Sequence, residues 1–338
     1  MTSRTVGGRQ TTFGYDGLNR LTSVNYPNGN TVTIAYFGNG RTQSVVTPQV
    51  SWTYTYDANA NLKTEMLTVG GQTYTTTYAY NTNDALSSIT YPLTGDVIAY
   101  APDNLGRPTT AGPYVTSVSY YRSGNYQEMK LGNGYSMKQT ETVRQWPLSI
   151  DAVKTGTTTG FMGRDHFYDG AGNVTGINDQ FDPSQILQMT YDRNNQLTST
   201  VGRWGLVNIG YDAVGNITSF LYPTVQNYYN YTNNKLTSIG VQNFSYDAYG
   251  NITSDTSHTY QYDDASNMTC GDCASASPIT YVYDGNNRRV SRTQGGVTTY
   301  YVHVANGDLI LEYTPSTHSG REHIYVNGKR IASKKVSM

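Results

Sequence analysis

The nine residues Tyr211–Ser219 read YDAVGNITS, and variants of this phrase recur from one end of the chain to the other. Tyr246 opens YDAYGNITS, and Tyr15 opens YDGLNRLTS. Self-similarity of this kind is typical of stacked or coiled repeat units, so the repeat predicts the architecture before any site is sought. Eight Tyr-Asp pairs head the phrase, at Tyr15-Asp16, Tyr56-Asp57, Tyr168-Asp169, Tyr191-Asp192, Tyr211-Asp212, Tyr246-Asp247, Tyr262-Asp263 and Tyr283-Asp284.

Decayed copies extend the pattern beyond these eight pairs. Tyr231 follows Tyr211 after 20 residues, but Thr232 stands where the Asp is expected. The match is weakest over residues 121–166, and the segment that begins at Tyr325 resembles a divergent last copy. We therefore expect a lead-in at residues 1–14, a repeat array over 15–325 that is irregular at 121–166, and a short, basic, solvated tail at 326–338.

The residues before each repeat Tyr alternate in polarity. Trp52, Tyr54 and Tyr56 fall on one face of an extended segment, with Ser51, Thr53 and Thr55 on the other. Such alternation in aromatic and β-branched residues predicts strands. Asp, Asn and Gly follow each Tyr and favour a turn, since Asp accepts from nearby backbone amides and Gly or Asn tolerates a positive φ. No segment has helical periodicity, so the sequence predicts an all-β fold.

The composition suits a thin, aromatic wall rather than a thick, dry core. Hydrophobic residues make up 37% of the chain and charged residues 14%, while the chain contains 32 Tyr against 7 Phe and 3 Trp. A Tyr ring can pack inward while its hydroxyl reaches a partner or water. The net charge of −1 argues against nucleic acid and acidic membranes as partners. We also expect no membrane span and no signal peptide within these residues, because no apolar stretch is long enough.

Two cysteines occur, Cys270 and Cys273, in the phrase Cys-Gly-Asp-Cys. One interpretation is a redox pair or half of a metal site, but structural zinc needs four ligands and no second pair exists. The simpler interpretation is a small disulfide, or two free thiols, in a turn, and we prefer it.

The five histidines do not form a recognised metal motif, and neither a nucleophile elbow nor a phosphate loop is present. The many aspartates belong to the repeat, where turn formation explains them. We therefore predict no catalytic residue, no metal ligand and no cofactor, and we rank an enzyme last among the functions considered.

The phrases YDGLNRLTS, YDAVGNITS and YDAYGNITS resemble the YD-repeat, or RHS-repeat, family, and the resemblance extends from about Tyr15 to about Tyr325. That family includes bacterial Rhs toxins, the B and C components of insecticidal toxin complexes, and teneurins. The resemblance implies a continuous, spiralling antiparallel sheet that forms a hollow shell or an open coil, and a secreted or cell-surface location. The family's aspartate autoprotease cannot be transferred, since the one Asp-Pro pair, Asp182-Pro183, lies inside the repeats.

Three functions follow as hypotheses. The first is a structural shell or scaffold segment around an encapsulated polypeptide, without the cap, autoprotease and toxin of the bacterial relatives. The second is a self-assembling extracellular filament or tube, since open sheet edges favour pairing between copies. The third is an adhesin or carbohydrate-binding module that presents exposed aromatic side chains, Trp52 or Trp204, to surface glycans.

Overall fold

The computed structural model describes all residues from Met1 to Met338 and contains 33 strands and one 3₁₀ turn. Strands that follow one another in the chain pair antiparallel, so the predicted all-β antiparallel fold is confirmed. The 3₁₀ turn, η1 (Pro315–Thr317), is three residues long, and no helix in the structure has the length and apolarity to cross a membrane.

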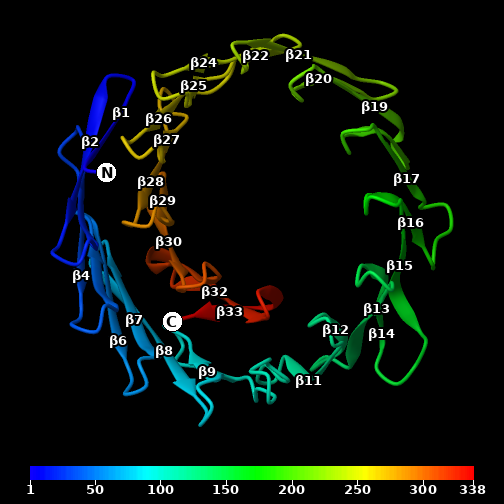
Figure 1. Cartoon of the computed structure of the whole chain (residues 1–338), viewed down its shortest axis with the longest axis horizontal. Helices are drawn as coiled ribbons and strands as arrows, with labels where there is room; N and C mark the ends of the chain where they lie inside the picture. The colour runs from blue at the N-terminus through cyan, green and yellow to red at the C-terminus, as the bar shows by residue number, and fades with distance from the viewer. The chain divides into compact units, whose positions relative to one another are not determined.

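The chain divides into two compact units, and unit 1 contains both ends of the chain: residues 1–112 and 245–338. Its N-terminal layer is a ten-stranded sheet (Figure 1). The strands of that sheet are β1 (Ser3–Val6), β2 (Arg9–Tyr15), β3 (Leu21–Asn25), β4 (Thr31–Tyr36), β5 (Thr42–Val46), β6 (Val50–Tyr56), β7 (Leu62–Val69), β8 (Gln72–Tyr80), β9 (Leu86–Thr90) and β10 (Val97–Ala99).

The C-terminal layer of unit 1 holds a two-stranded ribbon followed by an eight-stranded sheet. The ribbon is β24 (Ser245–Tyr246) and β25 (Ile252–Ser254). The sheet is β26 (Tyr260–Tyr262), β27 (Met268–Gly271), β28 (Ile279–Tyr283), β29 (Arg289–Gln294), β30 (Val297–His303), β31 (Leu309–Thr314), β32 (Ser319–Val326) and β33 (Lys329–Ser337).

Unit 2, residues 113–244, is a thirteen-stranded sheet. Its strands are β11 (Val115–Tyr120), β12 (Tyr126–Leu131), β13 (Tyr135–Glu141), β14 (Pro147–Lys154), β15 (Gly160–Tyr168), β16 (Val174–Asp179), β17 (Leu187–Tyr191), β18 (Leu197–Gly202), β19 (Gly205–Tyr211), β20 (Ile217–Leu221), β21 (Gln226–Thr232), β22 (Lys235–Ile239) and β23 (Gln242–Asn243).

The repeat phrase builds one strand end, one turn and the next strand start. After β19, the Asp212 amide donates to the Asn216 carbonyl at 2.9 Å, and the Gly215 amide donates to the Asp212 carbonyl at 3.2 Å. Gly215 has a φ of +92°, which explains why Gly or Asn recurs at this place. The ladder shifts register between Gly210 and Tyr211, so a β-bulge marks each such turn.

The repeat Tyr side chains tie one strand pair to the one before it. The Tyr211 hydroxyl donates to the Leu197 carbonyl at 2.9 Å, where the preceding repeat's strand begins. The same contact recurs for Tyr56, Tyr168 and Tyr191, which donate to the carbonyls of Thr42, Pro147 and Val174. The Tyr therefore stabilises the stacking of neighbouring repeats.

Ala60 occupies the left-handed turn position that most copies give to Gly or Asn, with a φ of +64°. A non-glycine residue there carries a steric cost, so Ala60→Gly should raise the free energy of unfolding by about 1 kcal/mol. Urea unfolding followed by circular dichroism measures this change. Ala58→Gly, in the same turn without the positive φ, is the control that should not stabilise, and equal effects at both positions would contradict the assignment.

Unit 1 buries its core between its two layers. Trp52 and Leu67 of the N-terminal layer are 2% and 0% exposed, and Val302 and Leu311 of the C-terminal layer are fully buried. The layers approach closely at Gly285, where a Cβ atom would lie 2.5 Å from Val45 Cγ1. Burial of both inner faces follows from the alternation of apolar residues along each strand.

Unit 2 has a smaller buried set, which includes Val115, Met129, Val207 and Ile209. Large apolar side chains in its strands and turns are instead exposed to solvent. These are Tyr135, Val143, Leu148, Phe161, Phe167, Phe181, Ile186, Val201, Trp204, Leu206, Val214, Tyr222, Val225, Tyr228 and Val241.

The structure places regular strands in three stretches that the sequence analysis set apart from the regular repeats. Residues 326–338 are not a solvated tail, because β33 pairs with β32 over eight residue pairs and buries Val336. The lead-in, residues 1–14, contributes β1 and most of β2. Residues 121–166 contain regular strands. In one of their turns Thr142 replaces the motif Asp, and its Oγ1 accepts hydrogen bonds from the Arg144 and Trp146 amides at 3.2 Å.

Candidate functional site in the seam of unit 1

The eight repeat aspartates predicted from the sequence lie in eight separate turns and do not gather into one site. In each, Oδ1 accepts from the backbone amides two and four residues later, at 2.8–3.0 Å. In five turns Oδ2 also accepts from the side-chain amide of an Asn at the fourth position. These carboxylates therefore stabilise the turns between successive strands.

Asp284 differs from the other seven because it also joins the two layers. Asp284 is only 4% exposed, and its Oδ2 accepts a hydrogen bond from Trp52 Nε1 at 2.8 Å. Trp52 is 2% exposed and stacks on Tyr54, with ring centroids 6.2 Å apart. A turn residue of the C-terminal layer thus satisfies the only polar atom of a buried indole in the N-terminal layer.

Glu65, in β7, is a second buried polar link between the layers. It is 1% exposed, and Oε1 accepts from the Ala305 amide at 3.2 Å and from the Tyr78 hydroxyl. Burial raises the pKa of Glu65, because the charged carboxylate loses its hydration. The hydrogen bonds from Tyr78 and Ala305 act in the opposite direction.

A third group of contacts fixes β32 and β33 to the end of the N-terminal layer. The Tyr91 hydroxyl donates to the His323 carbonyl at 2.7 Å, and the Thr94 amide donates to Glu322 Oε1 at 3.1 Å. Lys334 Nζ forms an ion pair with Asp96. We call these interlayer residues the polar seam: Trp52, Glu65, Tyr78, Tyr91, Thr94, Asp96, Asp284, Glu322 and Lys334.

A tyrosine-lined cavity of about 390 Å³ lies beside this seam, and the seam residues Tyr78 and Tyr91 form part of its lining. Tyr78, Tyr80, Tyr91 and Tyr100 line it from the N-terminal layer, and Tyr325 lines it from β32. No group of three or more His, Cys, Asp or Glu side chains in the structure is arranged to hold a metal ion. The hydroxyls of Tyr78, Tyr80, Tyr91 and Tyr325 already donate to Glu65 or to backbone carbonyls, so the cavity presents mainly the aromatic faces of these residues.

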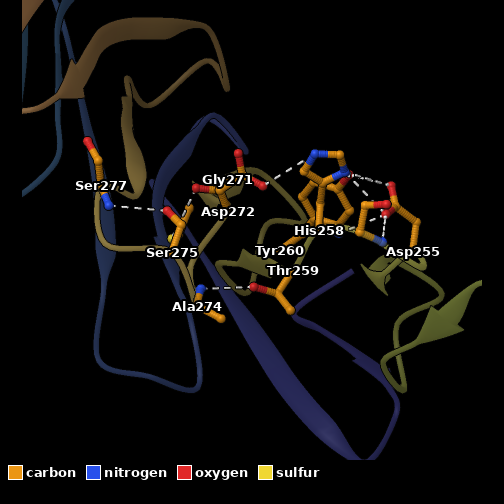
Figure 2. Close-up of polar contacts among 11 residues, drawn as sticks. Asp255, His258, Thr259, Tyr260, Gly271, Asp272, Ala274, Ser275 and Ser277 are labelled. Atoms are coloured by element: carbon orange, nitrogen blue, oxygen red, sulfur yellow. Dashed lines mark hydrogen bonds and ion pairs between the residues drawn. The ribbon is translucent and has the colours of Figure 1, made fainter.

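Cys270, in β27, forms a disulfide with Cys273, in the loop between β27 and β28, and their Cα atoms are 5.7 Å apart. Figure 2 shows how this loop lies against the turn before β26. The Ala274 amide donates to Thr259 Oγ1 at 3.0 Å, and His258 Nε2 lies 3.8 Å from Asp272 Oδ1. Only a single bridge, between Ser254 and Thr259, joins β25 to β26, so the loop adds contacts where the ladder is weakest.

Reduction of this disulfide should increase amide hydrogen exchange in the turn that the loop contacts. Cys273→Ser should reproduce the effect without reductant, since the loop is no longer closed and its contacts with Thr259 lose their constraint. Hydrogen exchange read by mass spectrometry over residues 255–280 measures it. Exchange over β6 and β7 should stay the same, and a uniform increase along the whole chain would contradict a local role.

The pH dependence of stability combines two opposite shifts. Burial raises the pKa of Glu65 and Glu322 above the ordinary 4.5, so their contribution is complete below pH 4.5 and decreases as the pH rises through the raised values. Hydrogen bonds from Asn216 hold the pKa of Asp212 below the ordinary 3.8, and that contribution is lost as the pH falls through the lowered value.

We therefore expect the urea midpoint to rise as the pH is lowered from neutrality towards about 4.5, and to fall below about 3.8. Urea melts at a series of pH values measure this maximum. A midpoint that declined steadily from neutral pH downward would show that the buried glutamates do not control stability in this range.

Sequence reasoning missed most of the polar seam. Glu65 and Glu322 are charged residues at inward positions of otherwise apolar alternating segments, and that position is the one signal that could have indicated them. Asp96 and Lys334 carried no signal, because nothing local indicates that residues 238 apart are in contact.

A family model described as Teneurin YD-shell matches residues 1–164 and 152–304. The chain belongs to this family. Its fold resembles that of TcdB2-TccC3, with a TM-score of 0.69, 14% identity, and coverage of 99% of this chain and 22% of that chain. The TcdB2-TccC3-Cdc42 structure matches with a TM-score of 0.60, 13% identity, and coverage of 98% and 24%.

The Photorhabdus luminescens Tc holotoxin pore is also similar, with a TM-score of 0.59, 13% identity, and coverage of 97% of this chain and 23% of that chain. The YD-shell chain thus spans less than a quarter of the length of these solved structures. No curated protein matches it. Together with the repeat turns, these matches support a shell-like structural role at the level of the family.

Proposed function

We propose that this YD-shell chain is a wall segment of a secreted or cell-surface container, and that its partner is a polypeptide held against the wall. The observation that carries the proposal is the use of the repeat phrase: all eight motif aspartates are committed to turns, and the repeat Tyr hydroxyls link successive strand pairs. The repeated residues form the turns and link the strands of the sheets, so we propose a structural role without catalysis.

The exposed apolar side chains of unit 2 support a polypeptide partner. Phe161 is 68% exposed and Phe181 is 50% exposed, while Tyr135 and Phe161 form an edge-to-face pair with centroids 5.3 Å apart. Exposed apolar groups of this size favour contact with another protein surface.

Cryo-electron microscopy of the purified chain, with its mass in solution measured alongside, tests the proposal. We expect discrete particles with a curved wall one or two sheets thick. Long ordered fibres would instead support self-assembly of copies through their sheet edges, with assembly itself as the function. β33 argues against edge pairing, since the exposed Lys329, Arg330 and Lys335 place positive charge along the last strand of its sheet.

A carbohydrate-binding role is a second candidate, which one observation favours. Trp204 is 48% exposed in the turn before β19 and is available to stack on a sugar ring. Trp52, the other aromatic expected to be exposed, is buried in the seam and cannot act this way, because the C-terminal layer covers it. Glycan-array binding that Trp204→Ala abolishes, while the fold is kept, would favour this candidate over the container.

A further inference from the structure

Three charged side chains converge where β33 meets the N-terminal layer. Glu322 in β32 and Lys334 in β33 are directly opposite each other in the antiparallel ladder, so their side chains lie on the same face. Lys334 Nζ is in direct contact with Asp96 Oδ2, which follows the turn between β9 and β10. An amine and a carboxyl group from opposite layers are thus adjacent, and the Glu322 carboxyl group lies on the same face of the sheet as the amine.

Thr94 fixes the geometry of the two carboxyl-bearing residues. Thr94 Oγ1 lies 3.0 Å from Glu322 Oε1 and 2.9 Å from Glu322 Oε2. The same oxygen accepts a hydrogen bond from the Asp96 amide at 3.1 Å. Glu322 is 1% exposed, and its pKa responds to both charges: Lys334 lowers it and Asp96 raises it. Burial raises the pKa of Glu322, so this carboxyl group accepts a proton more readily than an exposed glutamate does.

We propose that Lys334 and Asp96 form an intramolecular isopeptide bond, with Glu322 as the proton carrier. The Lys334 ammonium transfers one proton to Glu322, which passes it to an oxygen of Asp96, and the neutral amine then attacks Cγ of the neutral carboxyl group. The new Nζ–Cγ bond forms, a second proton leaves Nζ through the again ionised Glu322 and reaches the same oxygen, and the Cγ–O bond breaks as that oxygen departs with both protons as water. Glu322 returns to its starting state, and no oxidant, metal or other reactant is needed.

Proximity is the physical reason for the reaction. Well-oriented intramolecular reactions can reach effective molarities of about 10⁵–10⁸ M. The product would join residues 238 apart in the chain and fix the last strand covalently to the first layer. Cross-links that close long loops lower the entropy of the unfolded chain most, so the bond would stabilise unit 1 against unfolding. This inference is independent of what the chain encloses or binds.

Intact mass spectrometry of the full chain, folded and then denatured with its cysteines reduced and alkylated, tests the proposal. The expected result is a mass one water below that calculated from the sequence. Protease digestion should give a branched peptide that joins the segments around Asp96 and Lys334. A wild-type chain at its full calculated mass, with separate linear peptides for the two segments, would overturn the proposal.

Lys334→Arg is the matched control, because arginine keeps the ion pair with Asp96 but is not a nucleophile under these conditions. It should have its full calculated mass and a normal circular dichroism spectrum. Asp96→Ala is the alternative control if Lys334→Arg folds poorly, and it should also have its full calculated mass. A water loss that persists in both variants would indicate succinimide formation at an Asp-Gly pair such as Asp16-Gly17, and would also overturn the proposal.

Glu322→Gln separates a proton-carrying role from a structural one. Glutamine retains the acceptor for the Thr94 amide, so the variant should fold, but it should keep its full calculated mass. A structural role for Glu322 would change the melting temperature without changing the mass. Rapid and complete water loss in Glu322→Gln would show that Glu322 carries no proton in the reaction.

Discussion

Replacing Trp52 with alanine should lower the free energy of unfolding by about 3–5 kcal/mol. The substitution removes the largest fully buried side chain of unit 1 and leaves a cavity between its two layers. It also leaves Asp284 Oδ2 without its hydrogen bond from the indole, in a residue that is only 4% exposed. Both losses fall on the same interlayer contact, and for this reason we expect the effect to be among the largest of any single substitution.

Trp204→Ala is the matched control for Trp52→Ala, since it removes the same side chain from an exposed position. Urea unfolding should show a change within about 0.5 kcal/mol for Trp204→Ala. Trp52→Phe, alone and combined with Asp284→Asn, isolates the hydrogen bond from the packing in a double-mutant cycle. Equal effects of Trp52→Ala and Trp204→Ala would mean that the two layers of unit 1 do not pack as described.

Glu65→Ala should destabilise the protein by about 2–5 kcal/mol, because it orphans two buried donors, the Tyr78 hydroxyl and the Ala305 amide. Glu65→Gln should behave very differently. The glutamine Oε1 can accept from both donors, while the cost of burying a charge is removed. We therefore expect Glu65→Gln to be at least as stable as wild type at neutral pH.

The contrast between the two Glu65 variants is measured by urea melts at neutral pH and near pH 4.5. Glu65→Gln should also flatten the rise in stability that the wild type shows on acidification, since the raised pKa of Glu65 contributes to that rise. Thr64→Ala, at a neighbouring position of β7 on the other face, controls for disturbance of the strand. A Glu65→Gln variant as unstable as Glu65→Ala would show that the charge of Glu65 stabilises the seam.

The local structure of this chain could be predicted from nine-residue phrases. In YDAVGNITS, Tyr211 ends a strand, Asp212 accepts the turn amides, Gly215 adopts the positive φ, and Ile217 starts the next strand. Each of these interactions joins residues at most four apart or adjacent strands. The all-β fold, the antiparallel order and the family therefore followed directly from the sequence.

The same logic failed where other residues perform the motif's task. Thr142 forms the turn between β13 and β14 with a hydroxyl in place of a carboxylate. The segment lacks the Tyr-Asp motif, although its turn has the same hydrogen bonds. β33 was mistaken for a tail because its lysines obscure the alternation that buries Val336.

By itself, the sequence determined the repeat unit: which residues turn and which extend. The hydroxyls that link one repeat to the next became visible only in the structure. Only the tertiary structure decided which repeats pack together. Asp284 is indistinguishable in sequence from the other seven motif aspartates, yet it alone bonds Trp52, 232 residues away. The physical reason is that a periodic chain satisfies its backbone the same way in every repeat. The choice of partners depends on side chains at the inner faces, such as Glu65 and Glu322, and the repeat does not specify them.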